Sequence, residues 1–169
     1  MAVAGPRTLV LLRHAKAEPA GDSGDVRRPL TARGRRQAAA VGPQLAALGG
    51  VDLALVSSAL RTTETYELLA HHLSVHSHEV RDELYQAGPG DLLELLREVD
   101  GDVRSVLVVG HEPTMSGTAF VLHDTRDDLA SQVSLGIPTA TACVLDVPHP
   151  WAQLDRSGAH LRQIVRPGE

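Results

Sequence analysis

The sequence predicts an α/β fold, a three-layer sandwich in which helices cover both faces of a mostly parallel central sheet. Short apolar runs rich in Val and Leu recur along the chain, and segments with helical spacing separate most of them. Strands that alternate with helices favour a parallel sheet that is buried on both faces. A chain of 169 residues has the usual length of one domain, so we expect a single domain over 1–169.

The predicted strands are the short aliphatic runs, whose length suits buried strands better than helices. No convincing helix separates the last two of them, so we expect one of these two to run antiparallel at the sheet edge. The runs cover 8–12, 52–57, 104–109 and 141–147, with a weaker fifth at 160–165.

The predicted helices lie between these strands and carry apolar residues on one face. Thr31 is a good N-cap for the first helix, and Gly49 follows its end. Pro43 falls inside that helix and is expected to kink or shorten it. The helical segments are 32–48, 59–73, 90–99 and 113–123.

Composition narrows the function classes. A net charge of −5 argues against nucleic acid as a partner, because such binding needs surplus Lys and Arg. The lone Cys143 excludes an internal disulfide and a thiol metal site. The first apolar run is too short for a signal peptide or a membrane span, so we expect a cytoplasmic protein without membrane contact. The histidines of 71–78 lack a carboxylate or thiol partner in a metal-binding pattern, and we interpret them as a polar helix end and loop.

Polar residues follow three of the predicted strands directly. Arg13-His14 follows the first strand, Ser57–Arg61 the second, and Gly110–Pro113 the third. Ligands of open α/β sheets bind beyond the carboxyl ends of the strands. Two His and two Arg are therefore expected to meet at one edge of the sheet.

These residue types suit phosphoryl transfer. The planar fork of Arg grips phosphate oxygens and stays charged, and a neutral His can act as a nucleophile. Neighbouring guanidinium groups should lower the pKa of His14, whereas bound phosphate should favour a charged His111. Each motif alone has a plainer interpretation: Arg13-His14 as a solvated turn, and His111 as a residue that satisfies a helix start.

Four segments together resemble the histidine phosphatase superfamily. Residues 11–16 (LLRHAK) resemble its Arg-His-Gly signature, with Ala in place of Gly, and 29–34 (PLTARG) resemble its Leu-Thr-x-x-Gly segment. Residues 57–65 (SSALRTTET) are similar to its second Arg motif, and 109–113 (VGHEP) to its second His motif. The order and spacing agree over 8–147, and the small size and the Arg-His-Ala-Lys form resemble the SixA-type phosphohistidine phosphatases.

The resemblance implies a phosphoglycerate mutase-like fold and a ping-pong reaction that needs no metal or cofactor. His14 would attack phosphorus and become phosphohistidine, while Arg13, Arg61 and His111 hold the phosphoryl oxygens. Glu83 lies where many members carry an acid, and is a candidate proton donor or a solvated carboxylate. Lys16, Arg28 and Arg33 are candidates for a rim that attracts an anionic substrate, or are simply surface charges.

The substrate expected first is phosphohistidine on a carrier protein. His111 follows Arg61 by only 50 positions, which leaves little chain for a lid over a small molecule. One alternative is a phosphatase of small phosphate esters or nucleotide-related metabolites. Another, from a different class, is a phosphate-binding regulatory module without turnover.

Overall fold

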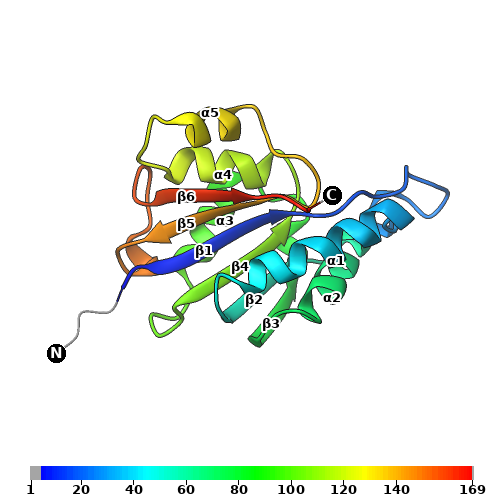
Figure 1. Ribbon diagram of the computed structural model, residues 1–169, viewed down its shortest axis with the longest axis horizontal. Helices are drawn as coiled ribbons and strands as arrows, with labels where there is room; N and C mark the ends of the chain where they lie inside the picture. Colours follow the sequence, from blue (N-terminus) through cyan, green and yellow to red (C-terminus); the bar gives the residue numbers. More distant parts are fainter. Residues whose placement is uncertain (1–4, 169) are drawn as a thin grey trace.

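The structure, a computed structural model, describes residues 5–168 and is built around a six-stranded sheet (Figure 1). The order of the strands across the sheet is β3-β2-β4-β1-β5-β6. Their bounds are β1 Arg7–Arg13, β2 Val51–Ser57, β3 Val75–Arg81, β4 Ser105–Gly110, β5 Ala142–Val147 and β6 His160–Val165.

Five of the six strands point in the same direction, and only β5 is reversed. Parallel pairing joins β3 to β2, β2 to β4 and β4 to β1. Strand β5 pairs antiparallel with both β1 and β6. We expected one of the last two strands to run antiparallel at the edge of the sheet. The antiparallel strand is β5, and it lies one position inside the edge, because β6 pairs with its outer side.

Helices cover both faces of this sheet, as Figure 1 shows. Helices α1 and α2 pack on one face, and α3, α4 and α5 pack on the other. The predicted three-layer α/β fold with a mostly parallel sheet is confirmed. The helix bounds are α1 Ala32–Ala46, α2 Leu60–Ala70, α3 Pro89–Arg97, α4 Thr114–Leu122 and α5 Asp128–Ser134.

Alternation along the strands explains the two cores. Leu9 and Leu11 of β1 contribute to the core beneath α3 and α4, whereas Val10 and Leu12 contribute to the core beneath α1 and α2. Successive side chains of a strand point to opposite faces, so an unbroken aliphatic run serves both layers at once.

The structure differs from the prediction in three elements. Residues 75–81 form the edge strand β3, so His76 and His78 lie on a strand and not in a loop. Helix α5 was not expected. Pro43 does lie inside α1, and the helix continues three residues past it to Ala46, two short of the expected end.

Within residues 5–168, no helix is long and apolar enough to cross a bilayer.

Candidate active site

Three neighbouring strands, β2, β4 and β1, end at the same edge of the sheet. Arg13, the last residue of β1, pairs in register with Gly110, the last residue of β4. The residues that follow these strands therefore lie together, and the ring centroids of His14 and His111 are 5.4 Å apart. Arg61 is the second residue of α2, just beyond β2.

His14 is fixed by the backbone around it. Its main-chain N–H donates to the Gly110 carbonyl at 3.0 Å. Its ring Nδ1 lies 2.7 Å from the Ala15 carbonyl oxygen, which can only accept, so Nδ1 carries the proton. In the neutral ring, Nε2 then holds a free lone pair. The hydroxyl of Thr65 in α2 accepts from the N–H of Ala15, which ties this turn to the helix.

The environment of His14 favours its neutral form. The side chain is buried, with 7% of its surface exposed. Burial lowers its pKa to about 4, the contact with the Ala15 carbonyl opposes that shift, and the charges of Arg61 and Arg13 add to it. The predicted effect of the guanidinium groups is therefore present, but loss of hydration lowers the pKa of His14 more.

His111 is neutral for similar reasons. Burial lowers its pKa to about 3, and the Arg61 charge is the second cause. Its Nε2 lies 2.8 Å from the hydroxyl of Ser57, the last residue of β2. Its Nδ1 is buried and has no hydrogen-bond partner among the described residues.

Each of the two arginines donates hydrogen bonds to a single residue. Arg13 donates from Nη1 to the Ile137 carbonyl at 2.9 Å. Arg61 donates from Nη1 to the main-chain oxygen of Asp25 at 2.9 Å and from Nη2 to its carboxylate at 3.2 Å. Within the described part of the chain, the Nε atoms of both arginines are buried and have no partner.

Sequence reasoning missed three contributors to this site: Ser57 as a partner of His111, Asp25 and Tyr85. Asp25 lies in a short 3-10 helix, η1 (Asp25–Arg27), and its carboxylate accepts from the Tyr85 hydroxyl. The Tyr85 ring meets that of His111 edge-on, with centroids 5.7 Å apart. The sequence offered no periodic pattern around Asp25 that could have placed it here.

The remaining predicted residues divide between this site and other surfaces. Arg28 lies close to it, because Nη1 donates to Asp25 at 3.0 Å and its charge lowers the pKa of His14. Lys16 is exposed, and Arg33 lines a different cavity beside the C-terminal segment. The Glu83 carboxylate forms an ion pair with Arg81 instead of contacting the histidines.

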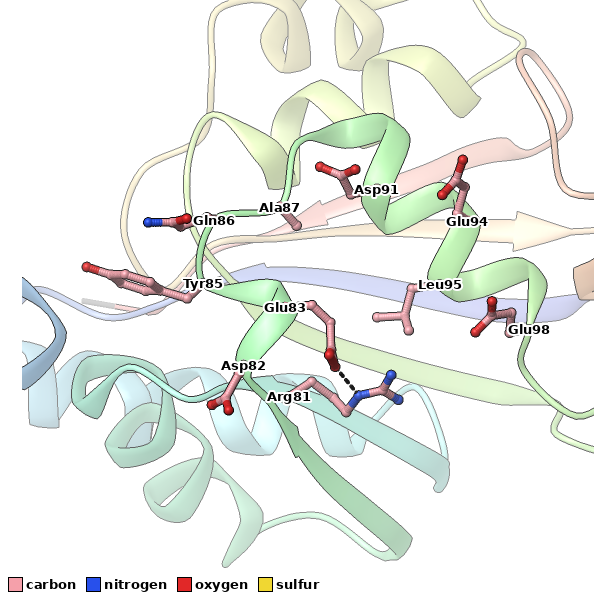
Figure 2. Close-up of a pocket in the computed structure, with 10 residues that line it drawn as sticks. All are labelled: Arg81, Asp82, Glu83, Tyr85, Gln86, Ala87, Asp91, Glu94, Leu95 and Glu98. Atoms are coloured by element: carbon pink, nitrogen blue, oxygen red, sulfur yellow. Dashed lines mark hydrogen bonds and ion pairs between the residues drawn. The ribbon is translucent and has the colours of Figure 1, made fainter.

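An acidic groove of about 550 Å³ lies beside the site, between the end of β3 and α3 (Figure 2). Figure 2 shows Glu83 turned toward Arg81, while Tyr85 extends the other way. Glu83 is the middle residue of a 3-10 turn, η2 (Asp82–Leu84), and Tyr85 is the residue that directly follows the turn, so the two side chains leave it in different directions. This turn delivers the tyrosine, and not the carboxylate, to His111.

Comparison with known proteins agrees with this geometry. The model of the histidine phosphatase superfamily (branch 1) matches residues 9–99, which include most of β1 and all of α1, β2 and α2. The chain belongs to the histidine phosphatase superfamily. An uncharacterized protein of Mycobacterium tuberculosis is 38% identical over 154 residues, which are 89% of this chain and 96% of that protein. One from Mycobacterium leprae is 32% identical over 157 residues, with the same coverage.

Solved structures extend the likeness over nearly the whole chain of this histidine phosphatase. A candidate phosphohistidine phosphatase SixA from Nakamurella multipartitia is 35% identical, has a TM-score of 0.85, and covers 98% of this chain and 99% of its own. Its counterpart from Agrobacterium tumefaciens is 29% identical with a TM-score of 0.78, over 96% and 99% of the two chains. A SixA complexed with tungstate has the same fold, at 21% identity, a TM-score of 0.78 and 95% and 97% coverage.

Proposed function

We propose that this protein is a phosphatase that acts through a phosphohistidine intermediate on His14, and that its substrate is phosphohistidine on another protein. The observation that carries the proposal is a set of buried nitrogens that have no hydrogen-bond partner within residues 5–168: Nε of Arg13, Nε of Arg61 and Nδ1 of His111. A buried donor without an acceptor is costly and rare in native proteins. A phosphoryl group, with three charged oxygens, supplies the acceptors that such nitrogens need.

The nucleophile is Nε2 of His14. Its lone pair is free because Nδ1 donates to the Ala15 carbonyl, and the depressed pKa keeps the ring neutral above about pH 4. As Nε2 bonds to phosphorus, the ring becomes positively charged, and the Nδ1–H contact with the carbonyl oxygen stabilises that charge. Arg13 and Arg61 stabilise the negative charge on the transferring oxygens.

The reaction proceeds in two transfers. In the first, the bond between phosphorus and the substrate imidazole breaks, the Nε2–phosphorus bond of His14 forms, and the departing imidazole takes a proton from water. In the second, water attacks phosphorus, the Nε2–phosphorus bond breaks and its electron pair returns to Nε2, so that His14 is again neutral. Phosphate leaves as H2PO4−, and one of its protons neutralises the hydroxide left by the first transfer. His111 and Ser57 lie beside this centre, and a bound phosphate dianion would favour protonation of His111.

The carboxyl groups near the site support phosphohistidine as the substrate over a phosphate ester. An ester leaves as an alkoxide and needs a proton donor more than an imidazole does. Asp25 is ionised, since hydrogen bonds from Tyr85 and Arg28 lower its pKa to about 2. Glu83 pairs with Arg81. Neither is arranged as a proton donor to a departing ester oxygen.

The chain between Arg61 and His111 also supports an accessible site. This span is filled by α2, β3, η2, α3 and β4, with only short connections between them. It carries no inserted segment that would enclose a small molecule. Residues 5–168 contain no cluster of three or more His, Cys, Asp or Glu side chains placed to hold a metal ion.

The test is release of phosphate from a protein phosphorylated on histidine, measured with a chelator present. We expect turnover by the wild type, none by His14→Ala, and a rate lowered by a factor on the order of 10² in Arg61→Ala, the scale for one preorganised donor. Arg36→Ala serves as the control and should retain activity within a few-fold, because Arg36 is exposed and lines the separate cavity beside the C-terminal segment.

Three results would contradict the proposal. Full activity of His14→Ala would show that His14 is not the nucleophile. Faster turnover of sugar phosphates or nucleotides than of the phosphohistidine protein would identify the ester phosphatase instead. Tight binding of phosphate without any turnover would identify the regulatory module.

A further inference from the structure

Asp25 concentrates contacts that an ordinary surface carboxylate does not make. One carboxylate oxygen accepts from Arg28 Nη1 at 3.0 Å. The other accepts from Arg61 Nη2 at 3.2 Å and from the Tyr85 hydroxyl. Its main-chain oxygen accepts from Arg61 Nη1 at 2.9 Å. Four donors from three separate segments of the chain therefore converge on one residue.

The consequence falls on Arg61. Its side chain is only 8% exposed, so a fixed acceptor matters more for it than for a solvated arginine. Asp25 engages both terminal nitrogens and leaves Nε without a partner. A guanidinium held at two nitrogens loses most of its rotational freedom, because its fork is planar.

We propose that Asp25 is a positioning residue that fixes the guanidinium of Arg61, so that Nε and the remaining N–H groups are oriented for the phosphoryl oxygens. This inference rests on the proposed function. Tyr85 and Arg28 hold the carboxylate in turn, and the ring of Tyr85 against His111 links the same arrangement to the second histidine. Orientation before binding is the property that preorganised catalytic charges require.

The Asp25 carboxylate affects anion binding in two opposite ways, and the experiment separates them. Its negative charge repels an incoming anion, so removing the charge alone should strengthen anion binding. Asp25→Asn removes the charge and keeps an oxygen that accepts from Arg61. Asp25→Ala removes the charge and the acceptor together. The difference between these two variants therefore reports on positioning.

The measurement is binding of tungstate, a tetrahedral oxyanion, to each purified full-length variant by calorimetry, with phosphate release from a phosphohistidine protein measured in parallel. We expect Asp25→Asn to bind tungstate at least as tightly as the wild type. Asp25→Ala should bind about tenfold more weakly than Asp25→Asn, the scale of a lost charge-assisted hydrogen bond. In turnover, kcat should follow the same order with KM nearly unchanged.

The controls use the same region of the molecule. Asp22→Ala removes an exposed carboxylate of the same loop and should leave binding and turnover unchanged. Tyr85→Phe leaves Asp25 in place and removes one of its donors. It should weaken tungstate binding by about threefold, and it replaces the Asp25→Ala measurement if that variant fails to fold.

Equal tungstate affinity in Asp25→Asn and Asp25→Ala would overturn the inference, as would wild-type affinity in Tyr85→Phe when Asp25→Ala cannot be purified. In either case normal wild-type turnover would leave the phosphatase proposal standing. If the wild type neither bound tungstate nor released phosphate, both proposals would fail together.

Discussion

At the scale of single residues, the chemistry of the site follows from which nitrogen of His14 carries a proton. The Ala15 carbonyl decides this, because it accepts from Nδ1 and leaves Nε2 free. Burial then keeps the ring neutral by making the charged form costly. In the proposed mechanism, the Ala15 carbonyl and the burial of the ring together prepare His14 to act as the nucleophile.

The pH dependence of kcat/KM tests this state of His14. Activity requires the neutral ring, and its pKa in the folded protein is about 4, compared with 6.5 for an unperturbed histidine. We therefore expect kcat/KM to hold as the pH falls through 6.5 and to decline only on approaching 4. A half-maximal point near pH 6.5, measured on a phosphohistidine protein and corrected for loss of the substrate in acid, would contradict the assignment.

The lowered pKa values of His14 and His111 also make the folded protein less stable in acid. Both buried histidines bind protons more weakly in the folded protein than in the unfolded chain. The unfolded chain takes up these protons near pH 6.5, so the free energy of unfolding decreases as the pH falls below that value. Activity in acid is therefore read only over the range in which circular dichroism shows folded protein.

The sequence was sufficient to place the four central residues but not their supports. Arg13 ends an aliphatic strand, His14 and His111 directly follow such strands, and Arg61 lies in the first turn of a helix just beyond one. The topology of a parallel sheet therefore brings the four residues together. Asp25 lies in a polar segment with no periodicity, and its contact with Arg61 spans 36 positions of sequence. Such a contact depends on how a loop folds back, which no local pattern specifies.

At the scale of elements, α1 supports the His14 turn through its first residues. Thr31 caps the helix by accepting from the N–H of Gly34 at 2.9 Å, as predicted. Gly34 also lies directly against the turn, since a Cβ atom there would come within 2.0 Å of the Lys16 carbonyl oxygen. The close approach leaves no room for any side chain at this position of the helix.

Gly34→Ala should therefore destabilise the protein despite the better helix propensity of Ala. We expect the free energy of unfolding to fall by about 1–3 kcal/mol, the usual cost of overpacking, together with a loss of turnover as Lys16 is displaced beside His14. Gly90→Ala in α3 is the matched control, because a Cβ atom there meets nothing within 4 Å. Denaturant unfolding measures both, and equal stability of the two variants would show that α1 does not press on the turn.

The elements that sequence analysis missed share a physical reason. Strand β3 reads VHSHEVR and lies at the sheet edge, where most of its side chains are exposed and no apolar run is needed. Helix α5 spans only Asp128–Ser134, too short to show a helical period. Buried elements are rich in apolar residues, and their hydrophobic pattern can be recognised in the sequence. Edge and surface elements can be polar and carry no such pattern.

At the scale of the whole molecule, the order of the strands explains why one edge carries the chemistry. Strands β2, β4 and β1 are neighbours and parallel, so their three carboxyl ends are adjacent (Figure 1). The acidic groove of Figure 2 borders this edge, and Tyr85 lines the groove while its hydroxyl contacts Asp25. The predicted convergence depends only on this topology, which alternating strands and helices already indicate.

The central claim is that phosphate passes through a bond to His14, and rapid quenching tests it most directly. The wild type is mixed with a phosphohistidine protein, quenched in alkali within milliseconds, and digested for mass spectrometry. We predict a phosphoryl group on the peptide that contains His14, stable in alkali, lost in acid and absent from His14→Ala. Steady turnover with no phosphoryl group on His14, or with the group on another residue, would contradict the account.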